Sequence, residues 1–545
     1  MEAEAKVLAV QLPRNPLLRD VTFWLARRHL HQRLLLCLIG GMLSAFAFAP
    51  FYLVFLLCLS YPLLMMCFHQ ATTQKQAFLY GWGFGFGQFF IGLLWIANAF
   101  YFQDDVPAWG GVVAVAGLSA LLAVYPGLVG VGFRLFFRRR PTERQVVAAV
   151  LVFVGMWSFA EWLRGHLFTG FPWNLNGYVF GFSDALLQVT NLVGVYGLGA
   201  VVLILAFLPY LMFHFGLKTI KGGLCLALFL GGLGGLYAYG AWRLPDQTDF
   251  IKDVKLRLVQ PNINQWDKWD PEKRADNFLD YLNMSRRKPE EGITHVIWPE
   301  TAVIYFLDQE PSRRYLIADM LGDEGMVLTG FPRRELGRDG VSIWNSFIAI
   351  DHNGQIAGLY DKSHLVPFGE YIPDFFHLLF SLLGVEEALG GLEYSPGPGR
   401  VTQHMPGLPP FGVLICYEII FPGAVIDEKD RPDWLLNLTN DAWYGDRTGP
   451  YQHFLQTRVR AIEEGIPIIR SAGTGISAVI DSYGQVVGQI DLNRRGVLDQ
   501  YLPRKISGGT LYTHVRDVIF FIMVGSCLIG GIVLCAGRRG RRDNT

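Results

Sequence analysis

Three side chains in the second half of the chain could together perform nucleophilic catalysis. Cys416 ends an apolar run, and Tyr417 and Glu418 follow it directly, so charge arrives where the predicted strand stops. Glu300 ends a similar run, and Lys362 follows another. A carboxylate, an ammonium group and a thiol are a base, a cation and a nucleophile. They form a complete set for chemistry through a covalent intermediate.

The distribution of cysteines supports a special role for Cys416. Of the seven cysteines in the chain, six fall in long apolar segments: Cys37, Cys58, Cys67, Cys225, Cys527 and Cys535. Cys416 is therefore the single cysteine of the predicted soluble region and has no disulfide partner within it. A lone cysteine is most often a small buried hydrophobic side chain. Its place at a strand end beside charged residues favours catalysis over that interpretation.

Charged residues are unevenly distributed along the 545-residue chain. Between residues 34 and 242 only 14 of 209 positions are Asp, Glu, Lys or Arg, whereas residues 243–510 carry 64 in 268 positions. An ordinary soluble domain has about 25% charged residues, which matches the second region and not the first. The first region therefore predicts a membrane domain, and a wholly soluble enzyme and a disordered chain are excluded.

Eight apolar segments approach the roughly 20 residues that a helix needs to cross a bilayer. They lie near residues 34–49, 52–68, 78–100, 110–136, 146–163, 194–214, 222–242 and 518–537. The predicted domains are a tail of residues 1–32, a membrane domain of residues 33–242, a soluble domain of residues 243–510, and a final span with a basic tail at residues 511–545. Alternating glycines inside the third span (Gly81, Gly83, Gly85 and Gly87) indicate close helix packing rather than a phosphate-binding loop.

Basic residues predict how the membrane domain is oriented. Eighteen Lys and Arg lie in segments that share one side of the membrane: residues 1–33, the loop at Lys75, residues 134–144, Lys218 with Lys221, and the C-terminal tail. The short loops on the other side, 101–109 and 164–193, carry only Arg164. Because cytoplasmic loops carry the excess of basic residues, we expect both termini in the cytoplasm. After seven spans, the soluble domain is then expected on the opposite side.

Residues 243–510 alternate β-rich runs with helical stretches, which predicts an α/β domain whose helices cover sheets. The strand candidates are Val254–Gln260, His295–Trp298, Gly325–Thr329, Ser346–Ile350, Gly412–Cys416, Trp434–Leu438 and Ile476–Ile480. The helical stretches are residues 271–288, 311–322 and 450–464. The 12 histidines show no paired ligand spacing, so no metal site is expected. Basic and acidic residues balance at 47 each, which gives no reason to expect nucleic acid as a partner.

Three segments resemble the signature blocks of the nitrilase superfamily, and more narrowly those of the apolipoprotein N-acyltransferase family. They are Trp298–Ala302 (WPETA), Lys362–Tyr371 (KSHLVPFGEY) and Cys416–Pro422 (CYEIIFP). Further support comes from Asn440–Gly445 (NDAWYG) and Gln452–Phe454 (QHF), and from the arrangement of seven spans, one soluble domain and a final span. The resemblance covers nearly the whole chain but does not explain the tail, residues 1–32.

The resemblance implies a polytopic α-helical membrane domain joined to an α/β, nitrilase-like αββα sandwich in the periplasm, on the outer side of the bacterial inner membrane. It implies transfer of an acyl chain from a membrane phospholipid to the α-amino group of the N-terminal diacylglyceryl-cysteine of an apolipoprotein. Glu300 would be the general base, Lys362 the oxyanion partner, and Cys416 the nucleophile that carries a thioester. Other positions that match the family's supporting or substrate-side residues are Trp269, Glu370, Tyr417 and Glu418. No cofactor is implied, because thioesters react readily with amines.

Two other functions remain open at this point. A membrane-anchored nitrilase-type amidase or hydrolase would use the same three residues with water as the acceptor, although eight spans favour a lipid substrate. A transporter or receptor with a ligand-binding outer domain is disfavoured by the few charges in the spans and by the lack of an evident inverted repeat. The apolar segment 375–392 is interpreted either as a lid that dips into the outer leaflet or as a buried core helix.

Overall fold

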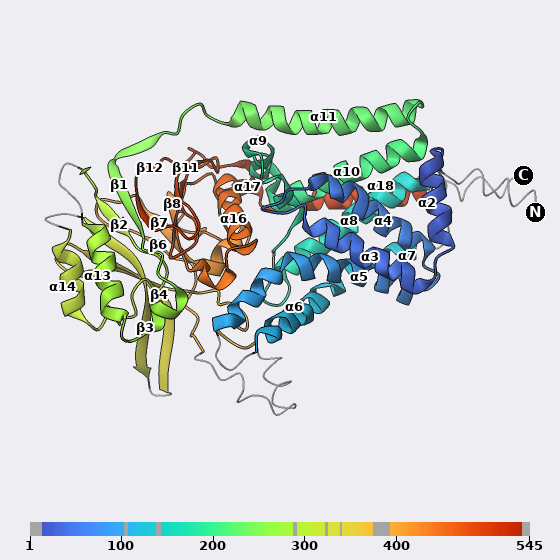
Figure 1. Ribbon diagram of the computed structural model, residues 1–545. Coiled ribbons are helices and arrows are strands. Elements are labelled where there is room, and N and C mark those ends of the chain that lie inside the picture. Colours follow the sequence, from blue (N-terminus) through green and yellow to red (C-terminus); the bar gives the residue numbers. More distant parts are fainter. Residues whose placement is uncertain are drawn as a thin grey trace, which may run out of the picture. The chain divides into compact units, whose positions relative to one another are not determined.

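The computed structural model describes residues 13–102, 107–137, 143–286, 291–321, 325–337, 340–373 and 393–536. The chain divides into two compact units, one formed by Met1–Leu244 with Leu511–Thr545 and the other by Pro245–Thr510. Figure 1 shows a helical unit and a unit built around β-strands. The segment 375–392, which the sequence interprets as a lid or a core helix, lies outside the described residues.

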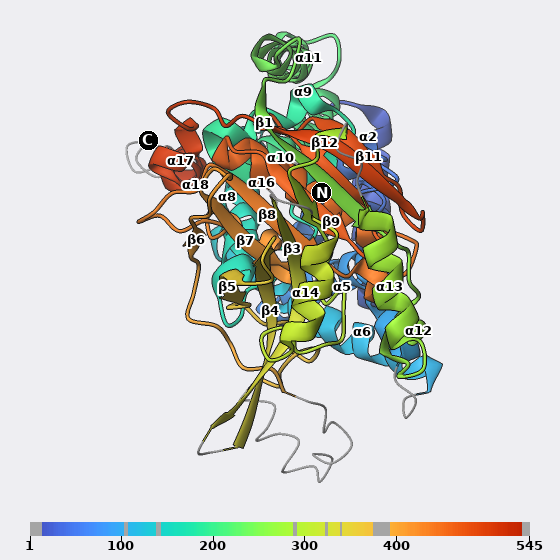
Figure 2. The same ribbon diagram turned by 90° about the vertical axis from the view of Figure 1, so that its left-hand side faces the viewer.

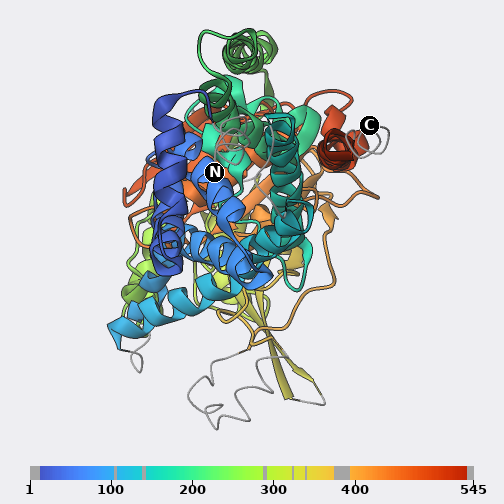
Figure 3. The same cartoon turned by 90° about the vertical axis from the view of Figure 1, so that its right-hand side faces the viewer.

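In its described residues the first unit contains helices and no strands, and each of the eight predicted apolar segments overlaps one or two helices. Its longer helices are α2 (Pro16–Ala26), α3 (Leu30–Ala45), α4 (Leu57–Gln70), α5 (Gln74–Gly92), α6 (Ala108–Leu122), α7 (Val124–Phe136), α8 (Glu143–His166), α10 (Thr190–Phe215), α11 (Ile220–Arg243) and α18 (Val518–Ala536). Short helices are η1 (Val54–Leu56), η2 (Leu94–Phe102), η3 (Asn176–Phe180), α9 (Asp184–Leu187) and α17 (Leu511–Val515). Helix α11 lies at the edge of this unit and is seen nearly end-on in Figure 3.

Length and composition identify fewer candidate spans than the eight apolar segments of the sequence. Five helices in the described part of the chain are long and apolar enough to cross a membrane, or six if α5 and η2, which meet at a bend of 49°, form one span. Helices α3 and α4 are apolar but shorter. At a rise of about 1.5 Å per residue, the 16 residues of α3 extend about 24 Å, less than the roughly 30 Å of a bilayer core.

The alternating glycines of α5 pack against two different helices, as the sequence predicted. A Cβ atom at Gly81 would lie 2.1 Å from the carbonyl oxygen of Pro126 on α7, and one at Gly87 would lie 2.2 Å from the carbonyl oxygen of Leu38 on α3. Gly85 likewise faces α7 and Gly83 faces α3. No larger residue fits these contacts, so the glycines allow three helix backbones to pack closely.

The second unit contains two six-stranded sheets. Their strands are β1 (Phe250–Gln260), β2 (His295–Ile297), β3 (Met326–Gly337), β4 (Gly340–Asp351), β5 (Ile356–Asp361), β6 (Thr402–Gln403), β7 (Phe411–Ile415), β8 (Trp434–Thr439), β9 (Ile468–Ala472), β10 (Ser477–Ile480), β11 (Val486–Ile490) and β12 (Gly496–Pro503). The strand orders are β12-β1-β2-β3-β4-β5 and β11-β10-β9-β8-β7-β6. In each sheet three neighbouring strands run parallel, β1–β2–β3 and β7–β8–β9, and the other pairs are antiparallel.

Helices cover the outer faces of the two sheets, which gives the expected αββα sandwich. Figures 1 and 2 show α13 (Arg274–Ser285) and α14 (Pro311–Asp319) over the first sheet, and Figure 1 shows α16 (Gly449–Glu464) over the second. Consecutive strand residues face opposite layers: Leu328 packs in the core between the sheets, and Val327 packs in the core under the helices. Because both faces of these strands are buried, their sequences are almost continuously apolar.

The ends of the strands place the chemically active residues at one edge of the sandwich. Glu300 follows parallel strand β2, Cys416 follows parallel strand β7, and Lys362 follows β5 directly. The predicted strand Gly412–Cys416 is one residue too long, because the strand ends at Ile415 and Cys416 begins the short helix η6 (Cys416–Ile420). Ligands of α/β sheets bind beyond the carboxyl ends of the strands, so this edge is where a site is expected.

Gly330 on β3 allows the segment that carries Glu300 to lie against the neighbouring strand. The N–H of Gly330 donates to the carbonyl oxygen of Pro299 at 3.1 Å, and its carbonyl oxygen accepts from the N–H of Ala302 at 3.0 Å. A Cβ atom at Gly330 would lie 2.6 Å from the nitrogen of Thr301 and 2.7 Å from the Cα of Glu300. These are backbone atoms and cannot rotate away.

The substitution Gly330→Ala should therefore displace the Glu300 segment and lower the melting temperature of the detergent-solubilised protein. Overpacking of this kind costs about 1–3 kcal/mol. Gly337→Ala on the same strand is the matched control, because its Cβ atom would meet nothing closer than the carbonyl oxygen of Gly340, at 3.7 Å. Equal melting temperatures for the two variants would show that the close approach at Gly330 is not required.

Candidate active site

Cys416 sits in a strained backbone conformation at the junction of β7 and η6. Its φ angle is 50°, in the left-handed region that non-glycine residues rarely adopt, at a cost on the order of 1–3 kcal/mol. The residue is buried, with 6% of its surface exposed. Its Sγ atom lies 3.5 Å from the hydroxyl oxygen of Tyr444. Because the strand before Cys416 and the helix after it fix its backbone, the side chain of Cys416 is held in one direction.

Glu300 is buried, and its charge raises the pKa of the Cys416 thiol. One carboxylate oxygen, Oε1, accepts a hydrogen bond from the side-chain amide of Asn345 at 2.7 Å. The other, Oε2, is buried without a hydrogen-bond partner among the described residues. Burial raises the pKa of Glu300, and the nearby Lys362 acts in the opposite direction. A buried oxygen with an available lone pair is suited to accept a proton.

Lys362 is almost completely buried, with 1% of its surface exposed, and it forms an ion pair with Glu370. Its Nζ atom lies 2.9 Å from Oε1 and 2.8 Å from Oε2 of that carboxylate. The amide of Asn345 also donates to Oε1 of Glu370 at 3.1 Å, so it bridges the two glutamates. Burial alone would lower the pKa of Lys362, but the charges of Glu370 and Glu300 outweigh it and raise that pKa above its ordinary range. The ammonium group therefore stays charged.

The thiol of Cys416 is protonated at neutral pH. Burial is the largest cause that raises its pKa to about 12, the charge of Glu300 adds to the effect, and Lys362 opposes it. Only a thiolate is a strong nucleophile, so this cysteine needs a base at the moment of attack. Glu300, whose charge acts on this thiol, is the candidate for that base.

Glu418 connects the loop that carries Lys362 to the loop that carries Cys416. Its Oε1 atom accepts from the backbone N–H of Ser363 at 2.9 Å and of His364 at 3.0 Å, and forms an ion pair with Arg400 at 2.5 Å. Its Oε2 atom accepts from the N–H of Ile415 at 2.8 Å. Burial would raise the pKa of Glu418, but Arg400 and these N–H groups outweigh it and hold the pKa below its ordinary value.

The structure gathers most of the site residues that the sequence singled out. Glu300, Lys362, Glu370 and Cys416 share one cluster, Glu418 connects its loops, and Tyr417 is buried beside Cys416. Trp269 differs: it ends the short helix α12 (Gln265–Trp269) with 45% of its surface exposed. Its neighbour Lys268 instead reaches the site, where its Nζ atom donates to the carbonyl oxygen of Glu300 at 3.1 Å.

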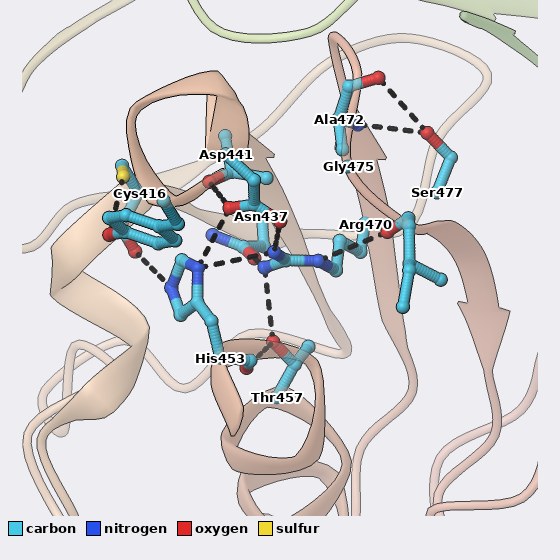
Figure 4. Close-up of polar contacts among 12 residues, drawn as sticks. Cys416, Asn437, Asp441, His453, Thr457, Arg470, Ala472, Gly475 and Ser477 are labelled. Atoms are coloured by element: carbon cyan, nitrogen blue, oxygen red, sulfur yellow. Dashed lines mark hydrogen bonds and ion pairs between the residues drawn. The ribbon is translucent and has the colours of Figure 1, made fainter. Parts of the chain in front are cut away.

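Besides Lys268, three residues of the site were not predicted as functional. Asn345 lies on β4, in a stretch whose sequence carries no signal beyond a strand pattern. Tyr444 and His453 lie in two further segments that resemble the family, Asn440–Gly445 and Gln452–Phe454. That resemblance is the sequence signal that could have identified them. Figure 4 shows His453 beside the backbone of Cys416, within a group of buried polar residues. In the described residues no group of three His, Cys, Asp or Glu side chains could hold a metal ion.

Comparisons with known proteins agree with this geometry. Residues 40–208 match the family model described as the apolipoprotein N-acyltransferase N-terminal domain, and residues 255–506 match the carbon-nitrogen hydrolase model. A protein of Rhodopseudomonas palustris named apolipoprotein N-acyltransferase is 36% identical over 511 residues, which cover 90% of this chain and 93% of that protein. The chain belongs to the apolipoprotein N-acyltransferase family.

Other similar proteins include one of the same name from Bradyrhizobium diazoefficiens, which is 37% identical over 91% of this chain and 94% of its own length. Among solved structures, an amidase from Nesterenkonia sp. is 20% identical, with a TM-score of 0.36, and the match covers 50% of this chain and 97% of the amidase. The family and the apolar helices make the chain a membrane protein, and its second unit has the carbon-nitrogen hydrolase fold. The membership does not favour the amidase alternative.

The substitution Glu418→Gln should destabilise this acyltransferase-family domain. It would remove the negative charge that pairs with Arg400, and it would replace one accepting oxygen by an NH2 group, which cannot accept a hydrogen bond. Breaking a buried ion pair costs about 3–5 kcal/mol. Thermal unfolding of the full chain in detergent measures the effect. Glu335→Gln is the control, because Glu335 is 67% exposed in its pair with Arg333 and such pairs contribute about 0–1 kcal/mol. A melting temperature as high as that of the control would contradict the assigned role of Glu418.

The pH dependence of Cys416 alkylation tests the pairing of Glu300 with Asn345. If Glu300 takes the thiol proton, the alkylation rate rises as Glu300 deprotonates, at a pH above the ordinary pKa of glutamate. The Asn345 hydrogen bond lowers the pKa of Glu300. The substitution Asn345→Leu therefore removes a contact that favours the carboxylate, and the rise should move to higher pH.

Alkylation by iodoacetamide, followed by mass spectrometry of the peptide that contains Cys416, gives this profile between about pH 4 and 9. Ser346→Ala is the matched control: it alters the next residue of β4, whose hydroxyl donates to Asp361 at 2.6 Å rather than to the glutamates. A profile that shifts equally in both variants, or in neither, would contradict the pairing.

Proposed function

We propose that this protein is an N-acyltransferase that moves an acyl chain from a membrane phospholipid, through a thioester on Cys416, to an apolipoprotein. The acceptor is the α-amino group of an N-terminal diacylglyceryl-cysteine. The observation that carries the proposal is the cluster of Glu300, Lys362 and Cys416 in a chain whose relatives of the same length are named apolipoprotein N-acyltransferases. The catalytic roles of the three residues are part of the proposal.

In the first half-reaction Glu300 takes the proton from the thiol of Cys416, and the thiolate attacks the ester carbonyl of the phospholipid. The carbonyl oxygen becomes negative and is stabilised by the Nζ atom of Lys362 and by the backbone N–H of Tyr417. One such contact contributes about 3–4 kcal/mol to the barrier. The C–O bond of the ester then breaks, the protonated Glu300 returns the proton to the leaving oxygen, and the lysophospholipid departs from a thioester.

In the second half-reaction the neutral α-amine attacks the thioester carbonyl, and the same two donors hold the oxyanion. Glu300 takes the proton of the amine, the C–S bond breaks, and the amide product leaves while Cys416 regains its proton. This is a ping-pong scheme in which each half-reaction uses the same base and the same oxyanion donors. The burial of all three side chains limits the access of water to the thioester.

The proposal includes a location. Basic residues concentrate in the segments that flank one set of helix ends, which supports cytoplasmic termini in the inner membrane of a bacterium and a periplasmic second unit. A phospholipid donor and a lipid-modified acceptor both reside in the bilayer, and the exposed apolar side chains of α11 are suited to a lipid environment. The donor, the acceptor and the bilayer are the partners proposed for this chain.

Intact-mass spectrometry tests the proposal on the purified full-length protein. Incubation with phosphatidylethanolamine and phosphatidylglycerol in detergent, without an amine, should add the mass of one acyl chain, and the adduct should be labile to hydroxylamine. A Cys416→Ala protein is the control and should gain no mass. Addition of a diacylglyceryl-cysteine peptide should then discharge the adduct and yield the N-acylated peptide.

Each other result has a definite meaning. An adduct that water discharges, with no acylated peptide formed, would establish a hydrolase instead of a transferase. An adduct that forms equally in the Cys416→Ala protein would contradict Cys416 as the nucleophile. The absence of any adduct in wild-type protein with a native melting temperature would contradict the thioester mechanism.

A further inference from the structure

The carbonyl oxygen of Cys416 is held by a buried histidine. His453 lies on α16, and its Nε2 atom is 3.3 Å from that oxygen. A carbonyl oxygen can only accept a hydrogen bond, so Nε2 carries the proton and donates it. None of the surface of His453 is exposed. The contact therefore joins the helix that covers the second sheet to the backbone of the proposed nucleophile.

Two charged residues fix the other side of the imidazole ring. The Nδ1 atom of His453 lies 3.0 Å from a carboxylate oxygen of Asp441 and 3.2 Å from a guanidinium nitrogen of Arg470. The same guanidinium donates to the second oxygen of Asp441 at 2.6 Å and to the side-chain oxygen of Asn437 at 2.6 Å. Asp441 and Arg470 are both fully buried. Figure 4 shows Arg470 between Asn437 and Asp441, with His453 next to both charged residues.

Such an arrangement restricts the imidazole to one orientation. Burial and the charge of Arg470 lower the pKa of His453, so the ring is neutral at pH 7 and carries its single proton on Nε2. Nδ1 then accepts from Arg470, while the Asp441 carboxylate, which cannot donate, acts on the ring by holding Arg470 in place. Hydrogen bonds at both nitrogen atoms restrict the imidazole, because a rotation of the ring would break both of them.

The orientation of the Cys416 carbonyl also sets the direction of the next backbone N–H. Peptide units are planar, and the peptide between Cys416 and Tyr417 is trans, so its C=O and N–H groups point in opposite directions. With the carbonyl oxygen turned toward His453, the N–H of Tyr417 points away from the imidazole. Figure 4 shows the sulfur atom of Cys416 pointing away from His453.

We propose that His453, oriented by Asp441 and Arg470, is a positioning residue that sets the peptide plane between Cys416 and Tyr417 and thereby forms the oxyanion-binding N–H. This inference rests on the proposed function. The left-handed backbone of Cys416 is strained, and the hydrogen bond from His453 to its carbonyl oxygen is a contact that helps to hold it. His453 acts through the backbone and does not touch the substrate.

Acylation and alkylation of Cys416 together distinguish a role of His453 in oxyanion binding from a general structural role. Acylation by a phospholipid ester develops an oxyanion and needs the Tyr417 N–H. Alkylation by iodoacetamide displaces iodide from a saturated carbon and develops none, so it reports only on the access and ionisation of the thiol. In a His453→Phe protein the donor is lost while the ring volume is kept.

The expected result for His453→Phe is an acylation rate that falls on the order of 100-fold, the size seen when an oxyanion donor is removed. Its alkylation rate at the same pH should stay within about twofold of wild type, because Glu300 and Lys362 are unchanged. His453→Gln keeps an N–H donor in the side chain, so its acylation rate should be at least about tenfold higher than that of His453→Phe. Should the Phe protein not fold, His453→Met takes its place, since its flexible side chain fills irregular space without a donor.

A matched control lies one helical turn away on the same helix. Thr457 is fully buried and donates to the carbonyl oxygen of His453, while accepting from Arg470 at 3.2 Å. Thr457→Val removes these contacts but leaves the imidazole and the Cys416 carbonyl in place, so both rates should match those of wild type. A Thr457→Val protein that acylates as slowly as His453→Phe would overturn the inference.

The remaining outcomes also decide the question. Acylation of His453→Phe at the wild-type rate, a parallel fall of acylation and alkylation, or no recovery in His453→Gln would each overturn the role of His453. Failure of the proposed function is distinguishable, because wild-type protein would then form no acyl adduct while still being alkylated.

Discussion

The site depends on one constraint, which is that Lys362 must remain charged in a place from which water is almost excluded. A buried ammonium group is stable only if negative charge nearby compensates for its lost hydration. Glu370 supplies that charge through contacts with both of its oxygens, and Asn345 ties Glu370 to Glu300. Burial and the charge of Glu300 together keep the thiol of Cys416 protonated.

The remaining structure of the second unit holds these groups at their places. Glu300, Lys362 and Cys416 each follow a strand and Asn345 lies on one, so their Cα positions are set by the register of a sheet. Glu418 joins the loop after β5 to the residue that ends β7 through backbone N–H groups. A sandwich with cores on both sides of each sheet resists small shifts of its strands, because interiors are close-packed. The hydrogen bonds of Glu418 can therefore keep residues close together that follow strands of different sheets.

Much of this arrangement could be predicted from the sequence, since it depends on local patterns. The apolar runs that end in Glu300 and Cys416 marked strands buried on both faces, and the charge deficit of residues 34–242 marked the helical unit. Short strands such as β9, which carries Arg470, were missed because a buried charge interrupts their apolar pattern. Asn345 was missed for a different reason: its importance arises from contacts with Glu300 and Glu370, which are distant in sequence. The lengths of α3 and α4 could not be predicted, because turns end these helices and hydropathy alone does not locate the turns.

The unusually basic thiol has a further consequence for a domain that contains a single cysteine. Disulfide exchange and oxidation to sulfenic acid both begin from a thiolate, and their rates fall with the fraction of thiolate present. At neutral pH a thiol with a pKa of about 12 is almost entirely protonated. We therefore expect the thiol of Cys416 to react slowly with disulfides and peroxides in the resting protein.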